Sequence, residues 1–492
     1  MYVALGLVLL CFVVLAVWTT WFRQRLDAPP MMPGLLPIIG HAHALIGDRK
    51  HYWKFIQNIN ATSFERGGAI EFWMVYMRYY ILTDPDDCLT LSNTCFNKPY
   101  VYDFAKDFLN NGFVTADASI WKAHRKLLNP SFNQQVIYTF IDEINLQARN
   151  LVLSLKNELG RKPFDVRPYF ISFTVSTAIR SSLGLEAEDQ KNVDRKYCET
   201  IDDLFALYCD RTQKVWLHID WVFNLSEMKR KQDKLTNSLK NIICPIIQKR
   251  KAEIMTKIET SSFENKSGKF EPILDQMLQM ANEQNGFTDE IIREHLDTFI
   301  AASYDTTSSS MVFTMLAIAS YPEIQNRIYN EIQEVLPNKD DDFSKQDLQK
   351  LVYLEAVIKE SLRLYSIIPV VARKVEVDVK LKNYTLRANS TCIIGLYALH
   401  RHPLWGPDVN EFKPERWLDP SRLPTNPNLF APFSIGKRNC IGKTFGMLMM
   451  KIALAHIVRQ YHISGSIHNI ECEFDIILKP VSGHQIGLKL RS

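Results

Sequence analysis

The pattern of hydrophobic and polar positions predicts a largely helical chain. Its longest helical pattern runs from Asp289 to Ser320. Thr288 suits the N-cap of this helix, Glu290 adds negative charge to the first turn, and Tyr321-Pro322 ends it. Because apolar side chains fall on several faces, we expect the helix to cross the interior rather than lie on the surface.

A second helix is expected near the C-terminus, and a few strands follow the helical middle of the chain. The helix begins after Gly442 and is expected to be amphipathic, with Leu448, Ile452 and Ala455 on one side. β-rich stretches occur at Val370 to Val379, Thr391 to Ile394 and Phe474 to Leu478. The predicted fold class is therefore mainly α with a minor β part.

The domain organisation follows from the N-terminal pattern. Residues 2 to 22 carry no charge and would span about 31 Å as a helix, which is the thickness of a hydrocarbon core. Arg23 and Arg25 follow directly, so we predict a membrane anchor over 1–22 with the rest of the chain in the cytosol. A cleaved signal peptide is disfavoured because the apolar run starts at once. A basic and proline-rich hinge over 23–40 would precede one large domain over 41–492.

Composition narrows the possible partners. A formal net charge of +4 over 492 residues is too small for a nucleic-acid-binding protein. The 9 cysteines form an odd number and include no C-x-x-C pair, which indicates a reducing compartment. The polar stretches from Glu259 to Lys269 and from Lys339 to Asp342 are expected to be surface loops of the large domain.

The segment from Pro432 to Gly442 carries the most specific pattern in the chain. Gly436 and Gly442 would let the backbone turn tightly beneath a flat cofactor. The free N–H groups of the following helix would point at the sulfur of Cys440 and stabilise it as a thiolate. The alternative is a buried cysteine beside a turn, but that would not explain the spacing of Phe433, Gly436, Arg438 and Gly442.

This pattern, F-x-x-G-x-R-x-C-x-G, resembles the haem-ligand signature of the cytochrome P450 family. The resemblance implies haem b with Cys440 as the axial thiolate of the iron, an arrangement that favours O–O cleavage. Trp121 and Arg125 resemble the family's W-x-x-x-R, whose side chains face a haem propionate. Further cofactor contacts are implied for Arg373, Arg438, Phe433, Gly436 and Gly442.

Two other motifs extend the resemblance. Glu360 and Arg363 form an E-x-x-R pair and, with Arg416, resemble the family's structural triad behind the haem. Asp305 and Thr306 resemble its acid–threonine pair, which implies that they deliver protons during catalysis. The alternative for Thr306 is a hydroxyl bonded back to the preceding turn.

Two positions depart from the family pattern. Ser303 stands where a glycine is usual, which puts the coupling of electrons to product in question. The chain is most similar to the animal fatty-acid ω-hydroxylase branch and its insect relatives. Ala302 occupies the place where many of that branch carry a glutamate that esterifies haem, so we expect non-covalent haem and less weight for fatty-acid ω-hydroxylation.

The resemblance implies a membrane-anchored monooxygenase of the endoplasmic reticulum that inserts one oxygen atom from O₂ into an apolar substrate, such as a lipid, hormone or insecticide. Electrons would come from NADPH-cytochrome P450 reductase, with cytochrome b5 as a second possible partner. The expected docking cations, with ordinary solvated side chains as an equal alternative, are Lys122, Lys126, Lys437, Arg438 and Lys443. Substrate choice is expected to depend on loops around Tyr197 to Trp221 and Phe104 to Phe113.

Other functions stay open at this point. A haem-thiolate isomerase or dehydratase would rearrange a peroxide without NADPH, although such enzymes tend to lack the acid–threonine pair. A non-catalytic haem protein that sequesters ligands would give no product. A cysteine hydrolase based on Cys440 is the weakest alternative, because no matching His/Asn context accompanies it.

Overall fold

The computed structural model describes residues 26–185, 187–259, 270–283 and 288–491. The expected anchor over 1–22 and the first residues of the hinge lie outside this range. None of the helices in these ranges combines the length and the hydrophobicity that a membrane span requires. The expected loop from Glu259 to Lys269 also falls mostly outside them, whereas Lys339 to Asp342 forms an irregular surface segment, as predicted.

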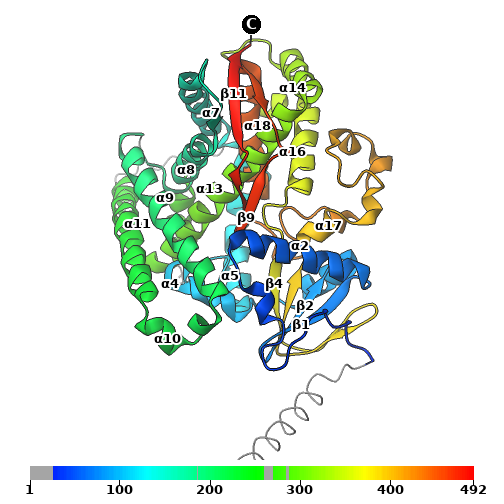
Figure 1. The fold of residues 1–492 in the computed structure, drawn as a ribbon. Coiled ribbons are helices and arrows are strands. Elements are labelled where there is room, and N and C mark those ends of the chain that lie inside the picture. Colours follow the sequence, from blue (N-terminus) through cyan, green and yellow to red (C-terminus); the bar gives the residue numbers. More distant parts are fainter. Residues whose placement is uncertain (1–25, 186, 260–269, 284–287, 492) are drawn as a thin grey trace, which may run out of the picture.

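Helix α13 (Asp289–Ser320) runs through the centre of the molecule, as Figure 1 shows. The Thr288 hydroxyl accepts a hydrogen bond from the backbone N–H of Ile291, which confirms the predicted N-cap. Helices α8 (Arg167–Leu183), α16 (Val352–Leu364) and α18 (Lys443–Gln460) pack against α13. Their apolar side chains bury α13 on all sides, so it crosses the interior as the pattern predicted.

The other helices surround this centre, with α9 and α11 packed together on the outer side of α8 (Figure 1). They are α2 (Arg49–Glu65), α3 (Pro85–Thr94), α4 (Lys106–Leu109), α5 (Ala118–Leu128), α6 (Gln134–Tyr138), α7 (Ile141–Leu155), α9 (Ala187–Gln213), α10 (Asp220–Leu225), α11 (Glu227–Glu259), α12 (Ile273–Glu283), α14 (Pro322–Val335), α15 (Lys345–Lys350) and α17 (Leu396–Leu399). The two segments expected as substrate loops are therefore largely helical.

The strands form a minor part of the fold, as predicted. The largest sheet has the order β1-β2-β7-β4, and its β2–β7 pair is parallel. Two of its strands confirm predicted stretches: β4 within Val370 to Val379 and β7 at Thr391 to Ile394. The strands of this sheet and of the small β5–β6 pair are β1 (Ala69–Met74), β2 (Met77–Leu82), β4 (Val371–Val375), β7 (Ser390–Ile394), β5 (Val379–Lys380) and β6 (Thr385–Leu386).

The stretch from Phe474 to Leu478 is β-rich, as predicted, but it consists of the adjoining ends of two strands. The chain reverses inside it, between β9 (Glu471–Asp475) and β10 (Ile477–Ser482), with Ile476 at a φ of 59°. A β-branched residue at positive φ is uncommon, so the sequence offers no turn signal here. A separate sheet joins β3 (Phe164–Asp165), β11 (Gln485–Leu490) and β8 (Tyr461–Gly465).

Helix α18 and the proline-rich hinge differ from what the sequence predicted. Helix α18 is not amphipathic, because every residue from Leu448 to Arg459 is buried, on all faces of the helix. The described end of the hinge lies along β1: Met32 N–H donates to Glu71 O at 2.8 Å, and Glu71 N–H donates to Pro30 O at 2.9 Å. The last part of the hinge is therefore docked on the large domain.

Candidate active site

The Cys440 loop is shaped by two residues in the left-handed region. Ser434 has a φ of 67° and Gly436 a φ of 74°, and Cys440 N–H donates to Phe433 O at 2.9 Å. A Cβ atom at Gly436 would lie 2.6 Å from Ser92 Cβ, so only glycine fits against α3. The loop places Cys440 just before the N-terminus of α18.

The environment of the Cys440 thiol contains both opposing and supporting effects. Burial raises the pKa of Cys440, while a hydrogen bond from Gly442 N–H and the charges of Arg125 and Lys443 act to lower it. The Gly442 contact confirms that N–H groups at the helix start reach the sulfur. Many protein atoms lie around the thiol, but Cys440 still has accessible surface. Open space therefore adjoins this residue.

Helix α13 has a matching opening in its middle. Ala302 is exposed and Ser303 and Thr306 are half-buried, although Ala301, Tyr304 and the rest of the turn are buried. The elements meet nearby, because a Cβ at Gly446 of α18 would lie 3.8 Å from Thr307 Oγ1 and 4.0 Å from Phe433 Cε1. Exposed side chains in two interior elements fit a flat cofactor between Cys440 and α13.

A cluster of cations lies in the predicted carboxylate-binding region. Arg373 on β4 is fully buried, and its Nε and Nη2 have no hydrogen-bond partner among the described residues. Burial and then Arg373 lower the pKa of Arg438 to about 10. Arg438 donates to Ala116 O at 2.5 Å, and its guanidinium lies 5.2 Å from the ring of Trp121. Buried, unpaired donors of this kind fit the carboxylates of haem.

Lys98 joins this cluster and was missed in the sequence. Burial, followed by the charges of Arg373 and Arg438, lowers the pKa of Lys98 well below its ordinary value. Its ammonium lies 4.6 Å from the ring of Tyr102. No local motif marks Lys98, because its neighbours in the cluster are hundreds of positions away in the chain.

Arg125 is placed differently from Arg373. Its guanidinium donates to Asn439 O at 2.9 Å, to Asn439 Oδ1 at 3.1 Å and to Asn129 Oδ1 at 2.8 Å. It thus binds the residue that precedes Cys440, and its donors are engaged with protein. Trp121 is buried and stacks on Phe96 at 5.9 Å between ring centroids.

The acid–threonine pair is present, but its two side chains have different partners. Thr306 Oγ1 donates to Ala302 O at 2.8 Å, which is the back-bonded arrangement given above as the alternative. Asp305 is buried, and its Oδ2 lies 3.0 Å from Lys479 Nζ on β10. Burial raises the pKa of Asp305, although Lys479 acts to lower it.

Glu360, Arg363 and Arg416 meet as the sequence predicted. Arg363 donates to both carboxylate oxygens of Glu360, at 2.8 and 2.9 Å, and Arg416 Nε donates to Glu360 Oε1 at 2.9 Å. All three side chains are buried, and Trp417 Nε1 adds a bond at 3.0 Å. The cluster joins α16 to the segment that leads into the Cys440 loop.

The expected docking cations do not all lie on the surface. Lys122, Lys126, Lys437 and Lys443 are exposed. Lys122 and Lys437 lie over the same ring of Phe96, at 4.6 and 6.0 Å, so they are neighbours. Arg438 is buried and points inward. Its guanidinium donates hydrogen bonds to backbone carbonyl oxygens there, which offsets the cost of burying the charge. The exposed patch therefore excludes Arg438.

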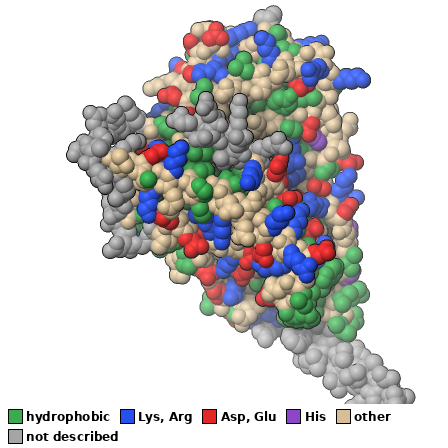
Figure 2. All heavy atoms as spheres, turned by 90° about the vertical axis from the view of Figure 1, so that its left-hand side faces the viewer, with side chains coloured by type: hydrophobic (Ala, Val, Ile, Leu, Met, Phe, Trp, Pro, Cys, Tyr) green, Lys and Arg blue, Asp and Glu red, His purple; other side chains and the backbone are tan. Residues whose placement is uncertain are grey.

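Exposed apolar side chains gather at one end of the molecule. They lie on and before α10, at Trp216, Ile219, Trp221 and Leu225, and near β1 and β2, at Ile38, Ile46 and Tyr76. Figure 1 places α10, β1 and β2 at the lower end, and Figure 2 shows hydrophobic side chains concentrated there. Such a concentration marks an interaction surface.

Comparison with known proteins gives a family match over residues 29–487, to Cytochrome P450. Cytochrome P450 4d8 of Drosophila melanogaster is 31% identical over 403 residues, which cover 80% of this chain and 87% of that protein. Cytochrome P450 4V2 of Mus musculus is 30% identical over 479 residues, covering 95% and 91%. Cytochrome P450 4c21 of Blattella germanica is 28% identical over 479 residues, covering 96% and 95%. Insect and mammalian proteins are both among the relatives.

Proposed function

This chain belongs to the cytochrome P450 family, and on that premise we propose that it is a membrane-bound monooxygenase whose iron ligand is Cys440. The family identifies it as a haem-thiolate enzyme. The observation that supports Cys440 is its place at the start of α18, with Gly442 N–H on the sulfur and open space beside it. When bound, haem supplies the oxygen chemistry, in which one atom of O₂ enters the substrate and the other leaves as water.

The protein's own residues hold the cofactor and its charges. Arg373, Arg438 and Lys98 are the groups that would bind the haem carboxylates, with Trp121 packed against Arg438. Arg125 fixes the backbone next to Cys440 through Asn439. The Ala302 side chain cannot form an ester bond, so haem is held by Cys440 and these contacts without a covalent link.

Thr306 and Asp305 are the residues proposed to move protons. Thr306 reaches the open space from α13 and can hold a proton at Oγ1. Asp305 lies one position earlier, with its carboxylate on the far side against Lys479. A buried carboxyl group at the position before the threonine can take up protons from the solvent side, which the threonine passes on as the reduction of O₂ requires.

The proposed location is the membrane of the endoplasmic reticulum, with the large domain in the cytosol. The apolar side chains around α10 and β1 would lie against the bilayer, since Trp and other apolar residues favour the membrane interface. The exposed patch of Lys122, Lys126, Lys437 and Lys443 would receive an acidic reductase, with cytochrome b5 as a second partner. The substrate is proposed to be apolar: a lipid, a hormone or a foreign compound such as an insecticide.

The deciding experiment compares Cys440→Ala with Cys244→Ala, a change at an exposed cysteine of α11. The full chain is expressed in cells, microsomes are isolated, and the spectrum is recorded after reduction with dithionite and addition of carbon monoxide. We expect a strongly red-shifted Soret band in the wild type and in Cys244→Ala, and none in Cys440→Ala. A shifted band that survives in Cys440→Ala would overturn the assignment.

The same microsomes test the remaining parts of the proposal. Haem should be extracted completely by acid acetone, and haem left on the protein would contradict non-covalent binding. The shifted band should sediment with the membranes, and its recovery in the soluble fraction would contradict the location. Oxygen consumption should require NADPH and the reductase, which an isomerase would not need.

A further inference from the structure

The carboxyl group of Asp305 is held from one side by a buried ion pair. Lys479 Nζ lies 3.0 Å from Asp305 Oδ2, and the two side chains are only 8% and 4% exposed. Arg167 of α8 is farther away, at 3.8 Å from Asp305 Oδ1. That Oδ1 atom has no hydrogen-bond partner among the described residues. Lys479 is therefore the dominant partner of this carboxylate.

Lys479 is itself part of a row of alternating charges that leads outward. Its ammonium lies 3.7 Å from Asp475 Oδ2, and Arg49 Nη1 lies 2.9 Å from that same oxygen. Arg49 Nη2 then lies 3.6 Å from Asp210 of α9. Exposure rises along the row, to 28% for the side chain of Arg49 and 41% for that of Asp210. The row thus joins α13 to partly exposed groups on α2 and α9.

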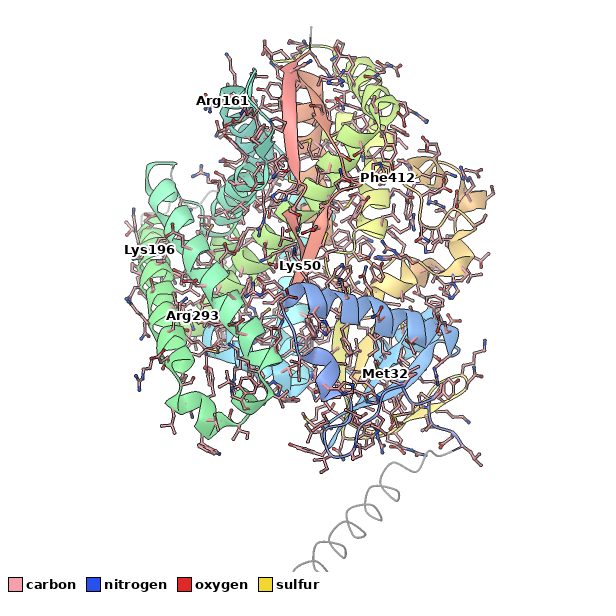
Figure 3. All side chains as sticks on the ribbon, in the orientation of Figure 1. Met32, Lys50, Arg161, Lys196, Arg293 and Phe412 are labelled. Atoms are coloured by element: carbon pink, nitrogen blue, oxygen red, sulfur yellow. The ribbon has the colours of Figure 1, made fainter. Side chains whose placement is uncertain are left out.

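The elements that carry this row lie side by side in the molecule. Helix α2 begins against the β9–β10 hairpin, where Lys50, labelled in Figure 3, donates to Glu471 at 2.7 Å. Strand β10 in turn packs against α13. Helix α9 also reaches this part of α13, because Tyr304 donates to Asp202 Oδ1 at 2.6 Å.

We propose that Lys479 is a positioning residue for the reaction, and that its ion pair with Asp305 decides how readily this carboxyl group takes up and gives off the protons that the reduction of O₂ consumes. This inference rests on the proposed roles of Cys440 and Asp305. When a proton leaves Asp305 toward Thr306, Asp305 becomes a buried carboxylate again. That negative charge is stabilised only while the ammonium of Lys479 faces it. The next proton arrives from the solvent side of the row.

The groups around Asp305 support a dependence on Lys479. Burial raises the pKa of Asp305, Lys479 acts to lower it, and Asp202 of α9 acts to raise it again. Burial acts to lower the pKa of Lys479, but Asp305 and Asp475 outweigh it and keep the lysine charged. Without Lys479, the pKa of Asp305 would still be raised by burial and by Asp202, and among the groups named here Arg167 alone would act to lower it. The pKa of the Asp305 carboxyl group would then rise further, and each proton it gave off would leave a buried charge with less to stabilise it.

The test compares Lys479→Met, which removes the charge and keeps the stem, with Lys479→Arg, which keeps the charge. Lys479→Gln is a milder change should Lys479→Met fail to fold, and Lys489→Met at an exposed position of β11 is the matched control. Each full-length protein is assayed with the NADPH-fed reductase for oxygen consumption from pH 6 to pH 9. Each is also assayed for oxidation of the dye ABTS with cumene hydroperoxide, which brings oxygen already reduced and needs no proton supply from Asp305.

For Lys479→Met we expect a loss of about tenfold in the NADPH-driven rate at pH 7, within the range by which a general acid or base accelerates a reaction. We also expect a pH profile displaced to higher pH, because loss of the ammonium raises the pKa of Asp305. The hydroperoxide-driven rate should stay within about twofold of the wild type, and Lys479→Arg should recover the NADPH-driven rate and its profile. A Lys479→Met protein with the wild-type profile would overturn the inference. So would a loss of equal size in both reactions, which is what a merely structural lysine would give. If the wild type itself shows neither reaction, it is the proposed function that fails.

Discussion

The affinity for haem should depend strongly on Arg373, because this side chain is fully buried and two of its nitrogens lack partners among the described residues. Each hydrogen bond to a charged group contributes about 1.5–3 kcal/mol. We therefore expect Arg373→Met to release haem to apomyoglobin about tenfold to a hundredfold faster than the wild type. Lys374→Met, at the exposed neighbouring position of β4, is the control. Equal release rates for the two variants would contradict a carboxylate-binding role.

Among individual residues, the contacts that the sequence predicted correctly were those within local motifs. Cys440 and Gly442 meet because they are close in the chain, and Glu360 and Arg363 meet because they are three apart on one helix. Lys98 and Lys479 gave no such signal. Each gains its chemical meaning from partners brought in by the fold, Arg373 for Lys98 and Asp305 for Lys479. The inward direction of Arg438 was missed for the same reason.

The Cys440 loop gives a prediction about a whole element, for which the chain offers a matched pair of glycines. Gly436 and Gly160 have nearly equal φ values, 74° and 73°, but a Cβ at Gly436 would meet Ser92 Cβ at 2.6 Å, whereas nothing lies within 4 Å at Gly160. Gly160→Ala should therefore lose only the cost of the left-handed conformation, about 1–2 kcal/mol.

Gly436→Ala should lose the same amount plus the cost of the clash, and the loop beneath the cofactor should shift away from α3. We expect a lower melting temperature than for Gly160→Ala and a smaller fraction of protein with the red-shifted carbon monoxide band. Thermal unfolding and the reduced spectrum measure the two effects. Equal behaviour of the two variants would mean that Ser92 gives way at little cost.

Elements were predictable where one strong local pattern dominated. Helix α13 has its predicted bounds because a capping residue, an acidic first turn and a final proline mark its ends. Strand β1 was missed because all of it is buried, which removes the alternation that marks a strand. The turn of the β9–β10 hairpin was not predicted because its residue at positive φ is Ile476 rather than glycine or asparagine.

The stability of the whole molecule should fall in mild acid because several histidines are buried and their pKa values are lowered. Burial is the main cause that lowers the pKa of His295, His400 and His456 from 6.5 to about 3. The bonds of His456 fix its neutral form: Arg459 donates to Nδ1 at 3.0 Å, and Nε2–H donates to Asn145 Oδ1 at 2.9 Å. A proton on Nδ1 would face the guanidinium of Arg459.

The direction in which stability changes with pH follows from proton uptake by the unfolded chain. Since the folded pKa lies below that of the unfolded chain, the unfolded chain binds these protons first as the pH falls below 6.5. Stability is therefore present above that pH and lost below it. Each buried histidine contributes a loss of about 2 kcal/mol between pH 7 and pH 5, spread over helices α13 and α18 and the segment after α17.

Chemical denaturation at pH 7 and pH 5 measures this loss, and His456→Gln tests its source. Glutamine does not titrate, so we expect this variant to be less stable at pH 7 and to show a pH-dependent loss smaller by about 2 kcal/mol, the share of one such histidine. His468→Gln, at an exposed position, should keep the wild-type dependence. An unchanged dependence in His456→Gln would mean that buried carboxyl groups, and not these histidines, make the fold sensitive to acid.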